Sequence, residues 1–279
     1  MLDIPDRAAL LALLDFYVEA GVDIALDEEP GDRLAESPAV EISEQRRDEA
    51  PPSPRPERPP GGQPLVQRIE AKTLPTSPDA AAQTAREQAR HAQNLAELEA
   101  LLASFEGCGL RVTAKSLVFA DGNPGGRVMF VGEAPGGEED RVGKPFVGRS
   151  GQLLDRMLAA IGLDRTQVYI ANVVPWRPPG NRTPTPQEVA ICKPFIEKQI
   201  ELADPDILVC LGGPSAQTLL NVRDGILKTR GRWFSYQTGR REIPALATLH
   251  PAYLLRQPLQ KRLAWRDFRA LKRALETPS

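Results

Sequence analysis

Short apolar runs alternate with amphipathic segments from about residue 110 to the end of the chain. Short, mainly apolar runs predict buried strands at 127–131, 168–173, 207–211 and 245–249. Apolar residues spaced three and four apart predict helices at 150–161, 186–203, 215–220 and 261–275. This alternation is typical of a mainly parallel sheet, so we predict an α/β fold with three αβα layers.

The first 76 residues follow a different pattern. Residues 7–20 have apolar side chains at helical spacing, which predicts an amphipathic helix in a segment 1–27 that Gly21 helps to end. Ten of the 27 prolines then fall between Pro30 and Pro75, among charged residues and few large apolar ones. Such a segment cannot bury enough surface to fold, so residues 28–76 are expected to be a disordered linker.

A helix is predicted to begin after this linker and to run to about residue 103. Ser77 has the character of an N-cap, with proline and aspartate in the next two positions. Leu95, Leu98 and Leu102 then form one apolar stripe. Residues 77–279 are therefore predicted to form one folded domain.

Charge, cysteine content and the lack of long apolar runs exclude several classes of protein. The formal net charge is −2, but acidic residues concentrate in the first fifty positions and arginines in the last fifty, which leaves the C-terminal half basic. Three cysteines without a close pair argue against a disulfide framework. No apolar run could span a bilayer and the N-terminus lacks signal-peptide character, so we expect a cytoplasmic protein without membrane contact.

Three polar segments follow three of the predicted strands, where ligands bind in open α/β sheets. They are GEAPGGEED at 132–140, NVVPWRPPGNRTPTP at 172–186 and HPAYLLRQP at 250–258. These segments resemble the active-site motifs of family-4 type uracil-DNA glycosylases, and the similarity extends over about residues 101–275. The resemblance implies a bacterial base excision repair enzyme that flips uracil out of DNA and hydrolyses its N-glycosidic bond.

The resemblance also implies roles for single residues. His250 would donate a hydrogen bond to uracil O2 as negative charge develops there, and Asn172 would read the O4 and N3 edge. Phe146 would stack on the flipped base; the flanking Gly143 and Gly148 favour a loop position for it.

The first motif supplies the remaining pocket residues. Gly132 and Ala134 would line the uracil site, and Ala134 stands where the related family-1 enzymes have a water-orienting aspartate. Glu133 is the candidate for positioning water, and Glu139 for the wall that excludes the methyl group of thymine. Alternatively, both carboxylates cap the loop or helix that follows.

DNA contacts are expected around the pocket. Residues 251–256 would form a wedge that enters the minor groove. Hydroxyls, backbone N–H groups and arginines in 177–186 and 212–215 suit phosphate binding. Lys228, Arg230 and Arg232 are further candidates, or belong to a solvated basic face. The predicted DNA-binding residues are Arg177, Asn181, Arg182, Gly213, Ser215, Arg232, Leu254, Leu255 and Arg256.

The sequence departs from family 4 at the positions of its iron–sulfur ligands. Family-4 members hold a [4Fe–4S] cluster with four cysteines, whereas this chain has Phe105 and Trp176 at two of these positions and keeps Cys108 and Cys192. Two thiolates would not hold such a cluster. We therefore expect no cofactor, and apolar packing in its place.

The substrate is expected to be uracil in single- or double-stranded DNA, and the enzyme a monomer. No lysine is evidently placed for Schiff-base chemistry, which predicts a monofunctional glycosylase. Residues 220–233 contain no histidine, so we expect turnover where some relatives become covalently trapped on DNA.

The alternative is a uracil or DNA sensor without hydrolytic activity. The N-terminal segment could also recruit a repair or replication partner.

Overall fold

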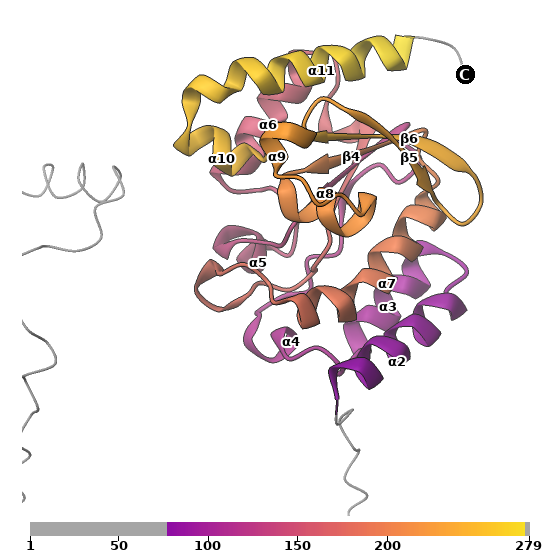
Figure 1. The fold of residues 1–279 in the computed structure, drawn as a ribbon. Helices are drawn as coiled ribbons and strands as arrows, with labels where there is room; N and C mark the ends of the chain where they lie inside the picture. Colours follow the sequence, from indigo (N-terminus) through magenta and orange to yellow (C-terminus); the bar gives the residue numbers. More distant parts are fainter. Residues whose placement is uncertain (1–76, 277–279) are drawn as a thin grey trace, which may run out of the picture. The chain divides into compact units, whose positions relative to one another are not determined.

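The computed structural model describes residues 77–276 (Figure 1). A six-stranded sheet in the order β1-β3-β2-β4-β6-β5 forms the middle layer. The pairs β3–β2, β2–β4 and β4–β6 are parallel, and the edge strands β1 and β5 are antiparallel to their neighbours. The strands are β1 Asp121–Gly122, β2 Val128–Gly132, β3 Val168–Asn172, β4 Ile207–Leu211, β5 Trp233–Gln237 and β6 Glu242–Thr248.

Helices cover both faces of this sheet, which confirms the predicted three-layer architecture. The α-helices are α2 Pro78–His91, α3 Leu95–Ser104, α4 Leu110–Thr113, α5 Gly137–Val142, α6 Arg149–Ala159, α7 Pro186–Ala203, α8 Gly213–Leu220, α9 Ile226–Thr229, α10 Pro251–Arg256 and α11 Lys261–Glu276. Three short 3₁₀ turns are η1 Arg165–Gln167, η2 Pro179–Asn181 and η3 Pro258–Gln260. The helix and linker predicted for residues 1–76 lie outside the described residues.

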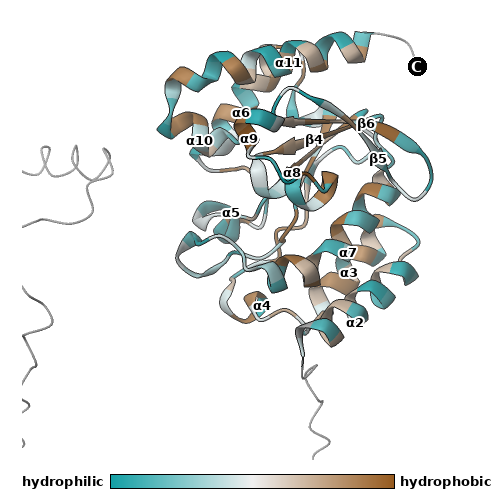
Figure 2. Ribbon diagram, in the orientation of Figure 1, coloured by the Kyte–Doolittle hydropathy of each residue, from teal (hydrophilic) through white to brown (hydrophobic). Residues whose placement is uncertain are grey.

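The central strands β2, β3 and β4 are buried on both faces, and successive side chains enter opposite cores. Val128 and Phe130 of β2 pack with the side chains of α6 and α11, whereas Met129 and Val131 pack on the α7 side. Figure 2 shows the amphipathic character of α11, along which teal and brown stretches alternate. Among residues 77–276, no helix combines the length and apolar composition needed to cross a bilayer.

Local sequence signals predicted where most helices begin, but not every point at which a helix is interrupted. The Ser77 side chain accepts from the backbone N–H of Ala80 at 3.2 Å, which confirms the predicted cap. The single helix expected up to residue 103 is instead two helices, α2 and α3. Asn94 caps the second one by accepting from Glu97 N at 2.9 Å, and this side-chain bond competes with continuation of the first helix.

The topology determines where a site can form. The chain passes from β2 to β3 on one side and then to β4 on the other, so the strand order reverses at β2. Crossover loops leave a crevice at the carboxyl ends of the strands at such a point. Gly132, Asn172, Leu211 and Thr248 are the last residues of the four parallel strands, so the segments that follow them meet at this edge.

Candidate active site

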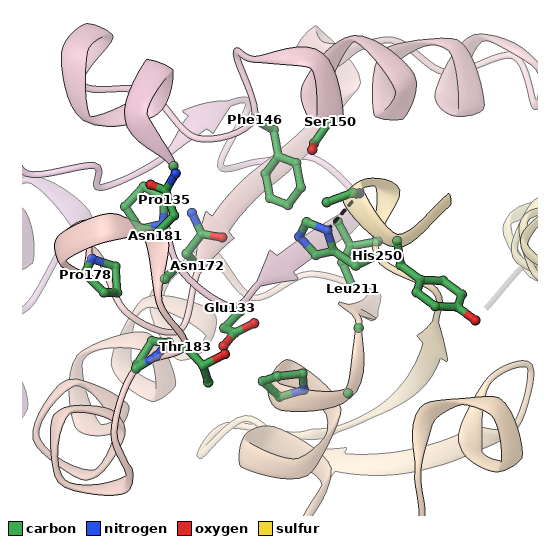
Figure 3. A pocket seen from close by; sticks show the side chains of 18 of the residues that line it. Glu133, Pro135, Phe146, Ser150, Asn172, Pro178, Asn181, Thr183, Leu211 and His250 are labelled. Carbon is green, nitrogen blue, oxygen red and sulfur yellow. Dashed lines mark hydrogen bonds between the residues drawn. The ribbon is translucent and has the colours of Figure 1, made fainter. Parts of the chain in front are cut away.

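A cavity of about 550 Å³ opens at the carboxyl ends of the parallel strands (Figure 3). The segments after β2, β3, β4 and β6 all contribute to its wall. The structure thus brings together residues that are up to 123 positions apart in the chain, from Glu133 to Arg256. Six of the predicted catalytic and uracil-binding residues line it: Glu133, Ala134, Glu139, Phe146, Asn172 and His250.

His250 follows β6 directly and is the N-cap of α10. Its Nδ1 accepts from the backbone N–H of Ala252 at 3.1 Å, the bond dashed in Figure 3. Burial lowers the pKa of His250 to about 4, and the nearby Arg256 guanidinium adds to this effect. The imidazole is therefore neutral near pH 7. With Nδ1 accepting, its proton is on Nε2, which can donate to a ligand in the cavity.

Glu133 and Asn172 each present a buried oxygen without a partner in the described part of the chain. These atoms are Oε1 of Glu133 and Oδ1 of Asn172. Burial raises the pKa of the Glu133 carboxyl, and a hydrogen bond with the Thr183 side chain opposes this shift only in part. An unpaired buried polar atom costs about 1–3 kcal/mol, so both oxygens are suited to gain a partner when a ligand or water binds.

Phe146 lies in the loop between α5 and α6, as its flanking glycines predicted. Its side chain borders the cavity, and its ring centroid lies 5.4 Å from that of His250. The ring also lies against Gly132, where a Cβ atom would approach Phe146 Cζ to 2.7 Å and Asn172 Oδ1 to 2.4 Å. Gly132 does not border the cavity itself. The absence of a side chain at this position allows Phe146 and Asn172 to come close together.

Comparison with known proteins agrees with this geometry. Residues 119–269 match the family model described as "Uracil DNA glycosylase superfamily". The chain belongs to the uracil-DNA glycosylase superfamily. Proteins named "Type-4 uracil-DNA glycosylase" are similar over most of their length. The one from Thermotoga maritima is 45% identical over 53% of this chain and 77% of its own length. The one from Archaeoglobus fulgidus is 38% identical over 64% and 92%, respectively.

Glu139 has a structural role in this member of the superfamily. Its Oε1 accepts from the backbone N–H groups of Val147 and Gly148 at 3.1 and 2.9 Å, and its Oε2 accepts from Gly136 at 3.1 Å. The carboxylate is thus used to cap α5 and to hold the Phe146 loop. This arrangement agrees with the alternative in which Glu139 caps the following helix. The same buried side chain would have to exclude the thymine methyl group by its bulk at the cavity wall.

Several predicted DNA-binding residues are placed at the mouth of the pocket. Asn181, Arg182, Gly213 and Arg256 border the cavity. Arg177 donates from Nε to Asn181 Oδ1 at 2.7 Å, which braces the loop after β3.

Arg182 is already paired with Glu188 through two hydrogen bonds of 2.7 and 2.8 Å. Arg232 does not border the cavity: its guanidinium lies 5.4 Å from the centre of the Phe234 ring.

Three sequence-based assignments to DNA need correction. The Ser215 side chain is fully buried and donates to Val131 O at 2.7 Å, so it joins α8 to β2. Leu254 is 1% exposed and packs with Leu249 in a small core cluster. Arg230 donates to Asp267 and to the Leu263 carbonyl. The sequence of the wedge segment did not reveal which of its leucines is buried against α6 and α11.

The four residues that the resemblance assigns to cluster-ligand positions do not fit an iron–sulfur cluster as a donor set. Phe105 and Trp176 are 3% and 2% exposed in the same core, and Phe105 makes an edge contact with Phe195 at 5.0 Å between ring centroids. Cys108 and Cys192 are also buried, with their sulfur atoms 4.0 Å apart. These four side chains supply two thiols and two apolar rings, whereas a [4Fe–4S] cluster takes four thiolates.

Some other residues of the cavity wall had no individual role predicted from the sequence. Thr183 contacts the Glu133 carboxyl, and Tyr253 and Ile226 close the side near α10. Thr183 lies in the loop after β3, whereas Glu133 lies in the loop after β2. Their contact therefore depends on tertiary structure alone.

Proposed function

We propose that the protein is a monofunctional uracil-DNA glycosylase that flips uracil out of DNA, hydrolyses the N-glycosidic bond and leaves an abasic site. One observation carries this proposal: the Nε2 donor of His250 and the unpaired oxygens of Glu133 and Asn172 border one cavity. Membership of the superfamily and the similarity to type-4 uracil-DNA glycosylases support the same activity.

His250 would stabilise the leaving group. Uracil departs as an anion, and a neutral Nε2–H donor can bind its O2 while negative charge builds up there. Because the pKa of His250 is about 4, the ring donates a hydrogen bond without transferring a proton near neutral pH. A donor that is fixed in advance in a dry site typically lowers the barrier by about 3–4 kcal/mol.

Asn172 would select the base. Its Oδ1 lacks a partner among the described residues, and the N3–H of uracil would supply one. Cytosine has an acceptor at N3, so it would leave this buried oxygen unpaired, at a cost of about 1–3 kcal/mol. Phe146, across from His250, would stack on the flipped base, which is typically worth about 1–3 kcal/mol.

Glu133 would hold the attacking water. Its buried Oε1 can accept a hydrogen bond from water at the sugar, while the Thr183 side chain fixes the rest of the carboxyl group. Ala134 cannot supply a carboxylate, which leaves Glu133 as the acidic side chain for this step. The cavity lining in the described part of the chain includes no lysine, which supports hydrolysis over Schiff-base chemistry.

Contact with the DNA would come from the mouth of the cavity. Leu255 is 36% exposed at the end of α10, next to Arg256. These two side chains are our candidates for the wedge that fills the space of the flipped nucleotide, in single- or double-stranded DNA. Asn181, Arg182 and the backbone of Gly213 would contact phosphates nearby.

The proposal includes catalysis without an iron–sulfur cluster, because the donor set at Phe105, Cys108, Trp176 and Cys192 does not fit one. It also includes a monomeric enzyme that acts on DNA in the bacterial cytosol. Recruitment of a repair or replication partner by residues 1–76 is a further part of the proposal, and removal of that segment should leave activity on naked DNA unchanged.

Uracil excision from a labelled duplex, followed by alkali to cut abasic sites, tests the function. We expect cleavage at uracil, and none in matched duplexes with cytosine or thymine at that position. Glu133→Gln, which keeps the shape of the side chain, should slow excision while the affinity for undamaged DNA stays the same. Selective binding of uracil-containing DNA without cleavage would refute hydrolysis and indicate a sensor.

A further inference from the structure

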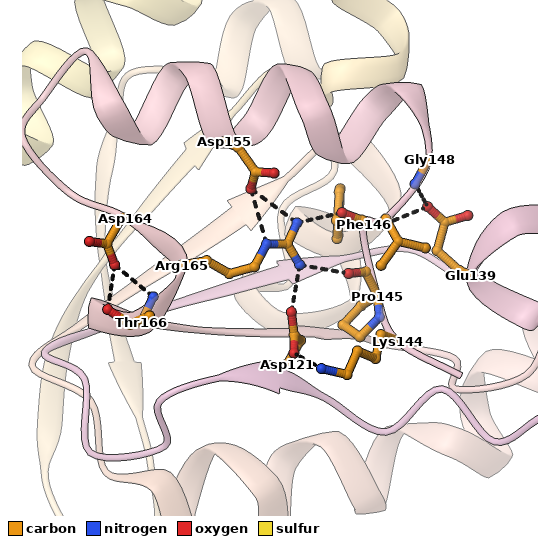
Figure 4. Close-up of polar contacts among 11 residues, drawn as sticks. Asp121, Glu139, Lys144, Pro145, Phe146, Gly148, Asp155, Asp164, Arg165 and Thr166 are labelled. Atoms are coloured by element: carbon orange, nitrogen blue, oxygen red, sulfur yellow. Dashed lines mark hydrogen bonds and ion pairs between the residues drawn. The ribbon is translucent and has the colours of Figure 1, made fainter. Parts of the chain in front are cut away.

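Arg165 contacts the backbone of the Phe146 loop (Figure 4). It is the first residue of η1, and it does not border the cavity. Its guanidinium donates to two successive backbone carbonyls, those of Pro145, at 3.1 Å, and Phe146. A single side chain therefore fixes both peptide groups on either side of the Phe146 Cα atom.

Two carboxylates hold the guanidinium in this position. Arg165 Nε donates to Asp155 Oδ1 at 3.0 Å, and Nη1 donates to Asp121 Oδ2 at 2.8 Å. Lys144 forms a second ion pair with Asp121 at 3.0 Å. The Arg165 side chain is only 23% exposed, so these contacts are partly shielded from water. Charge-assisted bonds in such a setting restrict the rotation of a long side chain.

The Phe146 backbone needs this support. Its φ angle is +54°, in the left-handed region that a bulky side chain rarely adopts. On one side, its carbonyl lies so close to Gly151 that a Cβ atom there would come within 1.6 Å of the oxygen. On the other side, Glu139 binds the next two N–H groups of the loop. The ring can keep its place against Gly132 only while this backbone conformation is maintained.

We propose that Arg165 is a positioning residue for uracil recognition: by binding the carbonyls of Pro145 and Phe146, it holds the aromatic ring where the flipped base stacks. This inference deepens the proposed function and rests on it. The forked guanidinium suits two adjacent carbonyls, whereas the single ammonium group of lysine can replace only part of this geometry.

The test compares Arg165→Met with a matched control, Arg127→Met. Arg127 is also bound by a carboxylate and a carbonyl, Asp206 at 2.7 Å and Leu275 at 2.9 Å, but it lies before β2, at the opposite end of the strand from the cavity. Single-turnover excision at saturating enzyme, affinity for undamaged duplex and Tm are measured for each variant. Loss of stacking predicts a fall in the excision rate of between about 5-fold and about 150-fold for Phe146→Ala.

We expect Arg165→Met to slow excision at least about 5-fold, with affinity for undamaged duplex within twofold of the parent. Arg127→Met should stay within twofold of the parent rate. If Arg165 acts through Phe146, adding Arg165→Met to Phe146→Ala should cause no further loss, since coupled residues are not additive. Arg165→Lys should recover part of the rate, and it replaces Arg165→Met if the latter is unfolded at the assay temperature.

Two results would overturn the inference: an excision rate of Arg165→Met that matches Arg127→Met, or full additivity with Phe146→Ala. A parent protein without excision activity refutes the proposed function instead. The same variants are then compared for affinity to a duplex with 2′-fluoro-deoxyuridine, whose glycosidic bond resists cleavage. Equal affinity of the parent and Arg165→Met for this duplex would overturn the positioning role as well.

Discussion

Substitution of His250 separates its two roles, which are capping α10 and donating to the leaving group. Asparagine is among the best N-cap residues, so His250→Asn keeps a side-chain acceptor for the Ala252 N–H. Its shorter side chain cannot place a donor where Nε2 lies. Alanine removes both functions. Comparing these two variants therefore distinguishes a catalytic donor from a residue that only stabilises the helix.

The expected magnitudes follow from the structure. Loss of a preorganised donor to a developing oxyanion costs about 3–4 kcal/mol, or roughly 100- to 1000-fold in kcat, for both variants. Loss of the cap costs about 1 kcal/mol in the free energy of unfolding. In a domain of this size it should lower Tm by about 2–4 °C in His250→Ala only. Single-turnover excision and thermal unfolding measure the two effects separately.

The pH dependence provides a second check. A histidine with a pKa of about 4 stays neutral from pH 5 to 8, so it adds no inflection to the rate profile of the parent in that range. His250→Asn with activity within threefold of the parent would refute the donor role. An inflection near pH 6.5 that disappears in His250→Asn would refute the neutral, Nε2-protonated ring.

Three further predictions test the rest of the site. Burial raises the pKa of Glu133, so the excision rate should fall on the acid side at a pH above the ordinary pKa of 4.5. Glu133→Gln should abolish this acid-side fall in a pH–rate profile. If the fall remains in the variant, another group causes it. Gly132→Ala should displace Phe146 and Asn172, with excision at least about tenfold slower, or about 1.4 kcal/mol of barrier, in a single-turnover assay; an unchanged rate would contradict the close contact. Anaerobically purified protein should lack absorbance near ~400 nm and unfold at the same Tm with or without an iron chelator; stoichiometric iron would contradict the apolar packing of Phe105 and Trp176.

The strands and longer helices could be predicted because their signals are local. Each parallel strand is an apolar run, buried at nearly every position, and helix α7 begins with a Thr185 cap, a proline and Glu188 three residues on. The edge strands β1 and β5 escaped prediction. β1 has two residues, and β5 is largely exposed, so neither shows the continuous apolar run of a central strand.

The candidate site was predicted through its motifs, but the sequence did not determine which side chains face the cavity. Glu133 and Glu139 belong to one acidic segment, yet one has an unpaired buried oxygen and the other binds three backbone N–H groups. Leu254 and Leu255 are adjacent, and only Leu255 is exposed.

The sequence by itself determined the order of the parallel strands and longer helices along the chain, the family and the loops that carry the chemistry, since each depends on neighbouring residues or on a contiguous motif. Only the tertiary structure assigned Ser215 to the Val131 carbonyl and Arg165 to the Phe146 loop. These bonds join residues 19 to 84 positions apart. Their partners are selected by how the helices pack on the sheet, and no local periodicity encodes that packing.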